Sequence, residues 1–167
     1  MQRRVASVAG ILLIFGILGF FLRSEGKKQP IEYNHKKHIQ MGLDCTFCHQ
    51  GLVGNSVRAG RPKEETCATC HLPEAPISQS AEEKKLLEYL RKREQIPWIQ
   101  VHRVPDFVFF SHRRHYTIGK IPCQTCHGKM EERTRPPEKP FVALTMDWCI
   151  SCHKQRGVST DCNACHR

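Results

Sequence analysis

The sequence has few of the residues that usually build a large hydrophobic core. Only 8% of its 167 residues are aromatic, although 40% are apolar in the broad sense. Many of these apolar residues lie in one uncharged run, residues 5–22. The rest of the chain therefore cannot bury a large core of its own, and we expect another source of stability to hold it together.

The chain also has no cysteine left over for a disulfide framework. All ten cysteines belong to five copies of Cys-x-x-Cys-His, namely Cys45/Cys48/His49, Cys67/Cys70/His71, Cys123/Cys126/His127, Cys149/Cys152/His153 and Cys162/Cys165/His166. This pattern is the attachment signature of a c-type haem. Positions i, i+3 and i+4 of a helical turn share a face, so both thiols can add to the porphyrin vinyl groups while the imidazole binds the iron. The sequence predicts five covalently bound haem c groups.

Other uses of these cysteines explain the pattern less well. Disulfides would not require a histidine after each second cysteine. Structural zinc sites, which combine cysteine pairs with histidine, remain the alternative. A zinc site, however, gives no reason for a histidine directly after the second cysteine in all five motifs. The chain lacks the His-Glu-x-x-His spacing of zinc peptidases, which excludes that chemistry.

Five histidines lie outside the motifs, and they match the five irons in number. They are His35, His38, His102, His112 and His115. We expect each to be the distal ligand of one iron, with Met41, Met130 and Met146 as the rivals beyond Met1. Bis-histidine ligation of all five irons would leave no coordination position for a substrate. We therefore predict no catalytic residues.

An internal repeat surrounds four of these histidines. His35-Lys-Lys-His38 matches His112-Arg-Arg-His115, and each precedes a motif, by ten residues to Cys45 and by eleven to Cys123. An aromatic residue, Tyr33 or Phe110, precedes each pair. Such a repeat indicates duplicated haem-binding units.

The net charge of +10 invites a nucleic-acid interpretation. Five haems would bring ten propionates, or about ten negative charges, which offset the basic excess. We therefore expect no nucleic-acid partner.

The N-terminal run predicts a membrane anchor. Residues 5–22 carry no charge, Arg3 and Arg4 precede them, and no Ala-x-Ala cleavage site follows. We expect an uncleaved signal-anchor helix with its linker over residues 1–28. Because c-type haem attachment is completed outside the cytoplasm, the haem domain is expected on the periplasmic, outer side of a bacterial cytoplasmic membrane, with a single span.

The remaining chain divides into three parts. Residues 29–77 form a two-haem module, residues 78–100 a helical spacer and residues 101–167 a three-haem module. The spacer is predicted from a capping box, Ser80 to Glu83, followed by an apolar stripe of Leu86, Leu87 and Leu90. The expected fold class is a multihaem cytochrome c with little regular structure, in which short α-helices surround five haems beside one N-terminal transmembrane helix.

The repeated His-x-x-His segments resemble those of the small class III cytochromes c. That resemblance implies that His35 serves the haem of His49 and His112 that of His127, while His38 and His115 cross to other haems. The anchor, the five motifs, and the segments VHRVPDFVFFSHRRH and MDWCISCHK together resemble the membrane-anchored pentahaem cytochrome subunit of alternative complex III, a quinol-oxidising respiratory assembly. A related complex, such as a molybdoenzyme-like membrane reductase, stays open.

The resemblance implies an electron-transfer subunit that is not itself an enzyme. It would relay electrons between membrane subunits that oxidise quinol and a downstream acceptor such as a cytochrome c or an oxidase. Two alternatives remain: an anchored quinol dehydrogenase that acts alone, and a multihaem reductase with one open iron.

Overall fold

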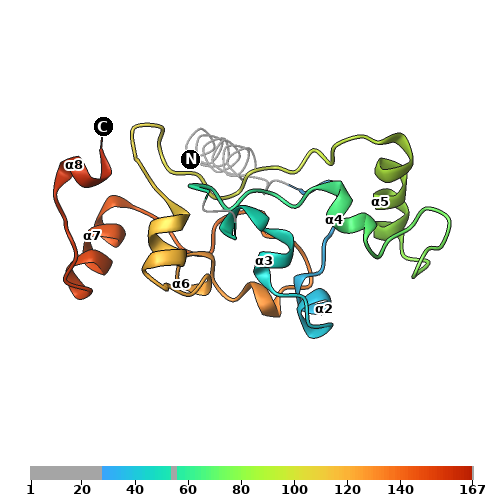
Figure 1. The fold of residues 1–167 in the computed structure, drawn as a ribbon, viewed down its shortest axis with the longest axis horizontal. Coiled ribbons are helices and arrows are strands. Elements are labelled where there is room, and N and C mark those ends of the chain that lie inside the picture. The colour runs from blue at the N-terminus through green and yellow to red at the C-terminus, as the bar shows by residue number, and fades with distance from the viewer. Residues whose placement is uncertain (1–27, 54–55, 167) are drawn as a thin grey trace, which may run out of the picture.

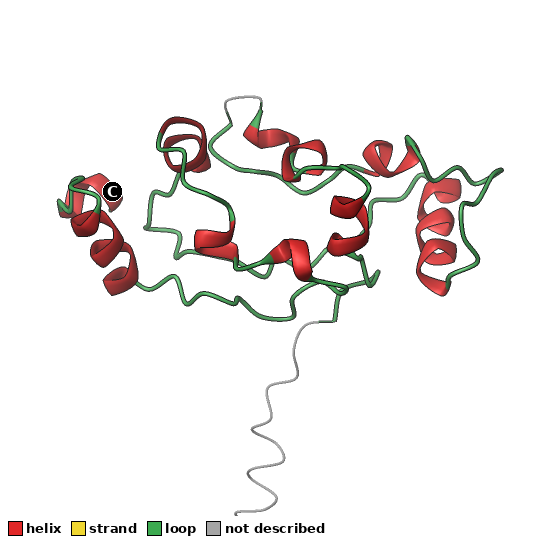
Figure 2. Ribbon diagram, turned by 90° about the horizontal axis from the view of Figure 1, so that it is seen from below, coloured by secondary structure: helices red, strands yellow, loops and turns green. Residues whose placement is uncertain are grey.

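The structure is a computed structural model that describes residues 28–53 and 56–166. Short helices joined by long irregular segments make up this part of the chain, and Figures 1 and 2 show them strung along one long axis. In chain order the helices are α2 (His35–Gln40), α3 (Cys45–Cys48), η1 (Gln50–Leu52), α4 (Glu64–Ala68), α5 (Ala81–Lys92), η2 (Arg113–Ile118), α6 (Gln124–His127), η3 (Met130–Glu132), α7 (Met146–Gln155) and α8 (Cys162–Cys165). Of these, η1 and η3 are 3₁₀-helices and η2 is a π-helix.

The part of the chain that is described contains no β-strand, only two isolated bridges, Leu72 with Ala75 and Val108 with His166. The expected class of short helices with little regular structure is therefore confirmed for these residues. Polar side chains begin several helices by accepting a backbone N–H of the first turn. Asn34 caps α2, Asp44 caps α3 and Thr145 caps α7 in this way.

Among the described helices α5 is the longest, and it confirms the helix predicted for the spacer, but its capping box is only half formed. The Ser80 hydroxyl accepts the N–H of Glu83 at 3.1 Å, as expected. In the full motif the Glu83 carboxylate would bond back to the N–H of Ser80. Here that N–H donates to the Ser78 hydroxyl, and the Glu83 carboxylate turns toward His71. The reason is that His71 and the backbone of residues 77 and 78 offer it more donors than Ser80 does.

The hydrophobic core is as small as the composition predicts. Among the described residues five apolar side chains are buried, and they are Ile31, Leu52, Leu86, Leu87 and Ile96. Leu86 of α5 packs with Ile31 and Ile96, and Tyr89, Leu90 and Trp98 lie around them. This cluster holds α5 against Ile31, near the start of the described chain, and against Ile96.

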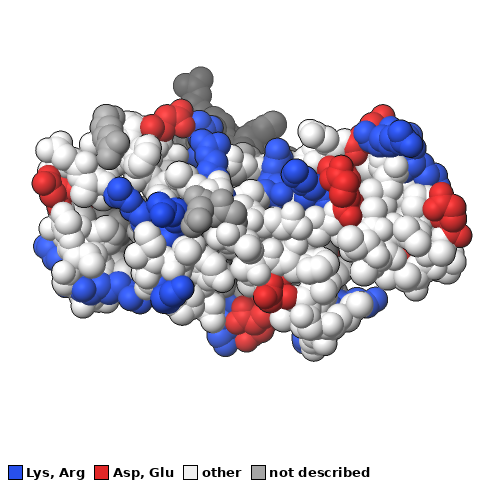
Figure 3. Space-filling view, viewed as in Figure 1, with Lys and Arg blue, Asp and Glu red and all other residues white. Residues whose placement is uncertain are grey.

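Charged side chains are scattered over the face of the molecule in Figure 3. Lysine and arginine residues occur along its whole length, with acidic residues between them and broad uncharged areas around both.

Within residues 28–53 and 56–166, no helix has the length and apolar character needed to cross a membrane. The anchor helix predicted at residues 5–22 lies outside the described residues.

Candidate haem sites

Each Cys-x-x-Cys-His motif forms one turn of backbone. The N–H of the motif histidine donates to the carbonyl of the first cysteine, four residues earlier, at 2.9 Å for His49, 2.9 Å for His71, 3.0 Å for His127 and 2.8 Å for His166. The fourth motif, Cys149/Cys152/His153, lies inside α7. This bond places the two sulfurs and the imidazole on the same face of the turn, as covalent attachment of a haem requires.

The second motif differs from the expected helical turn at Cys70. The helix α4 ends two residues before Cys70, which therefore lies in the turn that follows the helix. The Thr69 hydroxyl donates to the Thr66 carbonyl at 2.8 Å, and such a side-chain bond competes with continuation of the helix. The Cys70 N–H donates instead to the Cys67 carbonyl, three residues back, at 3.2 Å. Because the His71 N–H still reaches that same carbonyl, the turn keeps its shape.

The cysteine residues are exposed or partly exposed. Three of the ten cysteines are exposed and the other seven are partly exposed, so none is buried. The exposed ones are Cys45, Cys70 and Cys162. The Cys70 sulfur has a weak contact with the Thr69 hydroxyl, at 3.8 Å. All ten thiols are free of disulfides, and the attachment of a haem to each pair, Cys67 with Cys70 included, stays a prediction.

Five of the histidine rings are held by a hydrogen bond at Nδ1. The acceptors are mostly backbone carbonyls: Asn34 for His38 at 2.8 Å, Gly60 for His49 at 2.9 Å, Ser111 for His115 at 2.8 Å and Ser159 for His153 at 2.6 Å. The exception is His71, whose partner is the Glu83 carboxylate at 2.8 Å. A proton held on Nδ1 fixes the tautomer and leaves Nε2 free to bind a metal.

Three pairs of rings stand at the separation that an iron would need. With metal–nitrogen bonds of about 2 Å, two imidazoles on opposite sides of one iron have ring centres roughly 6 Å apart. The observed centroid distances are 6.2 Å for His38 and His71, 6.2 Å for His112 and His127, and 6.1 Å for His115 and His153. Each pair joins one histidine of a His-x-x-His segment to one motif histidine.

The two His-x-x-His segments have the same local structure. Tyr33 stacks on His38 at 4.4 Å and 26°, and Phe110 stacks on His115 at 4.5 Å and 27°. The same aromatic ring meets the first histidine of its pair edge-on, at 4.8 Å in one copy and 4.9 Å in the other. The repeat that the sequence predicted is therefore confirmed in three dimensions, including its aromatic residue.

The copies differ in the type of helix. The first pair lies at α2, an α-helix, whereas the second lies at the π-helix η2. A π-turn contains one residue more than an α-turn, which matches the one extra residue between His112 and Cys123.

The electrostatic influence of one cysteine on another indicates which motifs are neighbours in space. Burial, followed by the nearby Cys48 thiol, raises the pKa of Cys67 to about 11. Burial and then Cys123 raise the pKa of Cys45. Burial and then Cys152 raise the pKa of Cys126, and burial and then Cys165 raise the pKa of Cys149.

These neighbours connect the motifs in the order of their histidines 71, 49, 127, 153 and 166. Figure 1 shows the same order along the long axis, with the motif helices α4, α3, α6, α7 and α8 following one another across the molecule. The spatial order thus differs from the chain order only at the first two motifs.

Several rings are kept neutral. Burial, followed by His49 and His38, lowers the pKa of His35 to about 4. Burial, followed by His102 and His112, lowers the pKa of His127 to about 4. A metal ligand must be deprotonated, so a histidine that stays neutral at pH 7 suits this role.

Three of the five distal candidates have a buried ring nitrogen without a hydrogen-bond partner in the described structure: His35 Nδ1, His102 Nε2 and His112 Nδ1. His102 packs edge-on against His127, with ring centroids 4.4 Å apart, which is too close for an iron between them. The ring that faces His166 is that of Phe107, at 5.8 Å.

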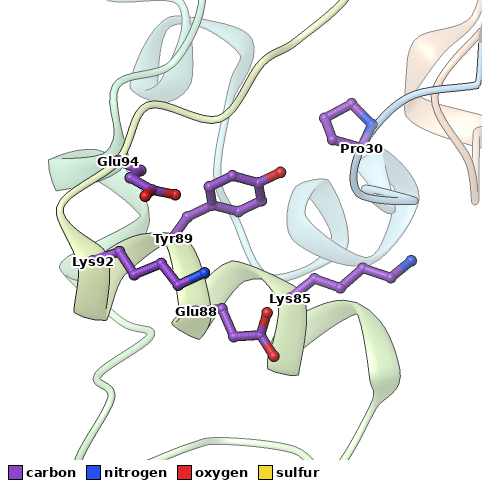
Figure 4. A pocket seen from close by; sticks show the side chains of 6 residues that line it. All are labelled: Pro30, Lys85, Glu88, Tyr89, Lys92 and Glu94. Carbon is purple, nitrogen blue, oxygen red and sulfur yellow. The ribbon is translucent and has the colours of Figure 1, made fainter.

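One pocket beside the first motif has the size and the mostly apolar lining that suit a large apolar group. A cavity of about 400 Å³ lies between the first motif and η2, and its lining is Thr46, Leu52, Val53, Tyr116, Thr117, Lys120, Ile121 and Pro122. A second pocket, on α5, is lined by Pro30, Lys85, Glu88, Tyr89, Lys92 and Glu94 and contains neither cysteine nor histidine (Figure 4). Over the described residues no three Cys, His, Asp or Glu side chains converge on a metal-ion site.

One residue of the site was missed by the sequence analysis. Glu83 was predicted only as a helix cap, yet its carboxylate contacts the ring of His71, twelve residues away. Nothing in the spacing of the two residues signals this contact.

Comparison with known proteins identifies the family. Residues 31–85 and 108–167 match the family model described as cytochrome c7 and related cytochrome c. The chain is also 30% identical, over 178 aligned positions, to a protein of Nitratidesulfovibrio vulgaris named menaquinone reductase, multiheme cytochrome c subunit. The alignment covers 93% of this chain and 83% of that protein. With its repeated haem-attachment motifs, the chain belongs to the cytochrome c7 and related cytochrome c family, and it is a multihaem cytochrome c that binds haem c covalently and transfers electrons.

Proposed function

We propose that this protein relays electrons along a line of five haems, between a quinone-active membrane partner and a redox partner on the periplasmic side. The observation that carries the proposal is the spatial order of the motifs, since each attachment turn has the next one as its neighbour along the long axis. When bound, haem supplies one-electron redox chemistry, which the protein tunes through ligands, burial and hydrogen bonds.

The proposed axial pairs follow the ring geometry where it is available. They are His38 with His71, His112 with His127, and His115 with His153, and His35 is assigned to His49 because the two rings are electrostatic neighbours. In this arrangement each His-x-x-His segment serves two adjacent haems. The backbone between the two histidines then fixes the distance between those haems.

His102 is the remaining distal candidate, and we assign it to the iron of His166. The segment that follows His102 reaches that motif, because Val108 bridges to His166 and the N–H of Phe109 donates to the Cys165 carbonyl at 2.7 Å. All five irons would then be six-coordinate. A site of this kind passes electrons and has no position for a substrate.

The proposed partner is a membrane subunit that reduces quinone. The sequence resemblance implied quinol oxidation, whereas the named relative belongs to a menaquinone reductase. We adopt the direction of electron flow that the name of the relative implies, in which electrons enter from the periplasmic side and reduce the quinone. The proposed location is the outer side of a bacterial cytoplasmic membrane, held there by residues 5–22.

The test compares the isolated chain with the native complex. The isolated full-length chain should bind haem and accept electrons from a reduced low-potential mediator, yet it should not reduce a menaquinone analogue. The complex purified through a tag on this chain should reduce it. Quinone turnover by the isolated chain, or rapid reduction of the haems in the complex by a menaquinol analogue without any reverse reaction, would contradict the proposal.

A further inference from the structure

Glu83 is a buried carboxylate surrounded by donors. It lies on the first turn of α5, and 5% of the residue is exposed. One carboxylate oxygen accepts from His71 Nδ1 at 2.8 Å and from the N–H of Ile77 at 3.0 Å. The other accepts from the N–H of Ser78 at 2.6 Å and from the Ser78 hydroxyl. Because every neighbour donates, the ionised carboxylate is the form that this site fits.

This contact makes His71 different from the other held histidines. The Nδ1 groups of His38, His49, His115 and His153 donate to neutral backbone carbonyls. His71 instead donates to the Glu83 carboxylate, whose other donors are backbone amides and a hydroxyl. Of these donors, the imidazole is the one that can take up part of the negative charge of the carboxylate. A carboxylate behind a metal-bound histidine fixes the ring and makes the ligand more basic.

We propose that Glu83 is a positioning residue that lowers the reduction potential of the haem at His71 below those of the other four. The inference rests on the proposed ligation of that iron by His71 and His38. A more basic ligand backed by a buried negative charge stabilises the ferric state over the ferrous state. The proton stays on His71 Nδ1 in both states, so the effect needs no proton transfer.

The position of this site gives the effect a role in the relay. The His71 motif lies next to α5, at the end of the line of motifs opposite α8 (Figure 1). A low potential at one end makes that haem the least able to hold an electron, and it favours transfer toward the interior of the line.

The test replaces the charge with an isosteric amide. In Glu83→Gln, one of the five redox components should move upward, with its reduced-to-oxidised ratio at a fixed potential rising about tenfold, or about 59 mV for one electron. The matched control is Glu82→Gln, one residue earlier on the same helix, where the carboxylate accepts from the N–H of Glu32 and from Lys85. This control loses the same charge but should move no component. The measurement is a redox titration followed by electron paramagnetic resonance (EPR), with intact mass to count the haems.

A second variant should act in the opposite direction. Ser78→Ala removes a hydroxyl donor from the carboxylate but leaves its charge, so more of that charge falls on His71 and the same component should move downward. A purely structural role of Glu83 predicts no such reversal. If Glu83→Gln loses a haem, the shift measured in Ser78→Ala decides whether Glu83 sets the reduction potential of the haem at His71.

The outcomes separate this inference from the ligation on which it rests. A wild-type protein with a high-spin haem that disappears from the spectrum in His71→Ala would mean that the ligation is wrong. A fully low-spin wild-type protein in which Glu83→Gln and Ser78→Ala both behave like Glu82→Gln would overturn the role of Glu83 alone.

Discussion

At the scale of single residues, the ability of a histidine to bind iron depends on which of its ring nitrogens is engaged in a hydrogen bond. The sequence predicts ten iron ligands from counting and spacing, but it does not say where each Nδ1 donates. Those acceptors are carbonyls such as Gly60 and Ser159, and a backbone carbonyl has no side-chain identity that a sequence pattern could reveal. Glu83 is the one side-chain acceptor among them, and it also lay outside the reach of spacing arguments.

His102→Ala tests the residue with the least regular surroundings. The substitution should open one iron, because its buried Nε2 has no other partner in the described structure. About a fifth of the haem should become high-spin and bind carbon monoxide. Optical spectra of the ferrous protein, with and without carbon monoxide, measure this. Lys84→Ala, at an exposed position of α5, is the control. An unchanged spectrum in His102→Ala would mean that His102 is not a ligand.

At the scale of elements, the sequence predicts the repeat, but it does not predict that the helix of the second copy is a π-helix. The His-x-x-His pairs and their aromatic residues could be read from the sequence, and both copies have the predicted aromatic contacts. The extra residue before Cys123 could also be seen in the sequence, but the spacing does not show which turn of the backbone accommodates it. In the structure it is accommodated in η2, which is a π-helix. In α5, the helix was predicted, whereas the turn of Glu83 away from Ser80 depends on a contact with a distant segment.

The attachment of α5 should weaken in acid. Glu82 accepts from Lys85 and from the N–H of Glu32, and although burial raises its pKa, these contacts lower it below the usual 4.5. Because the folded pKa is depressed, the stabilisation is present above about pH 4.5 and is lost as the pH falls through the lower folded value.

Glu82→Gln should therefore be less stable than the wild-type protein at pH 7, by about 1 kcal/mol or less. The difference should close as the pH falls through the depressed pKa of Glu82 in the folded protein. Hydrogen exchange of the α5 amides at several pH values measures it. Glu88→Gln, on the same helix, is the control, and a difference that stays constant with pH would contradict the assignment.

At the scale of the whole molecule, the line of haem sites was beyond sequence reasoning. Chain order would place the first motif at one end, but the contact between Cys45 and Cys123 puts it in the interior of the line, with the second motif outside it. The proposed crossing of His38 to the haem of His71 agrees with this exchange, since the two rings lie 6.2 Å apart. A crossing ligand is a long-range contact, and the class III resemblance implied that it occurs without saying which haem it reaches.

The anchor can be tested by removing it. A protein in which residues 1–27 are replaced by a cleavable signal peptide should be exported, carry all five haems and leave the membrane fraction, because the described residues contain no membrane-spanning helix. Fractionation and intact mass measure the outcome. Continued membrane association of this variant in a host without partner subunits would show that residues 5–22 are not the anchor.

If five haems, each with two histidine ligands, form the relay, every iron of the protein is low-spin. Spin quantitation by EPR of the oxidised full-length protein, combined with its intact mass, measures this. We expect five haems per chain, all low-spin and six-coordinate. A mass with fewer haems, or a high-spin ferric signal amounting to one haem per chain, would contradict it.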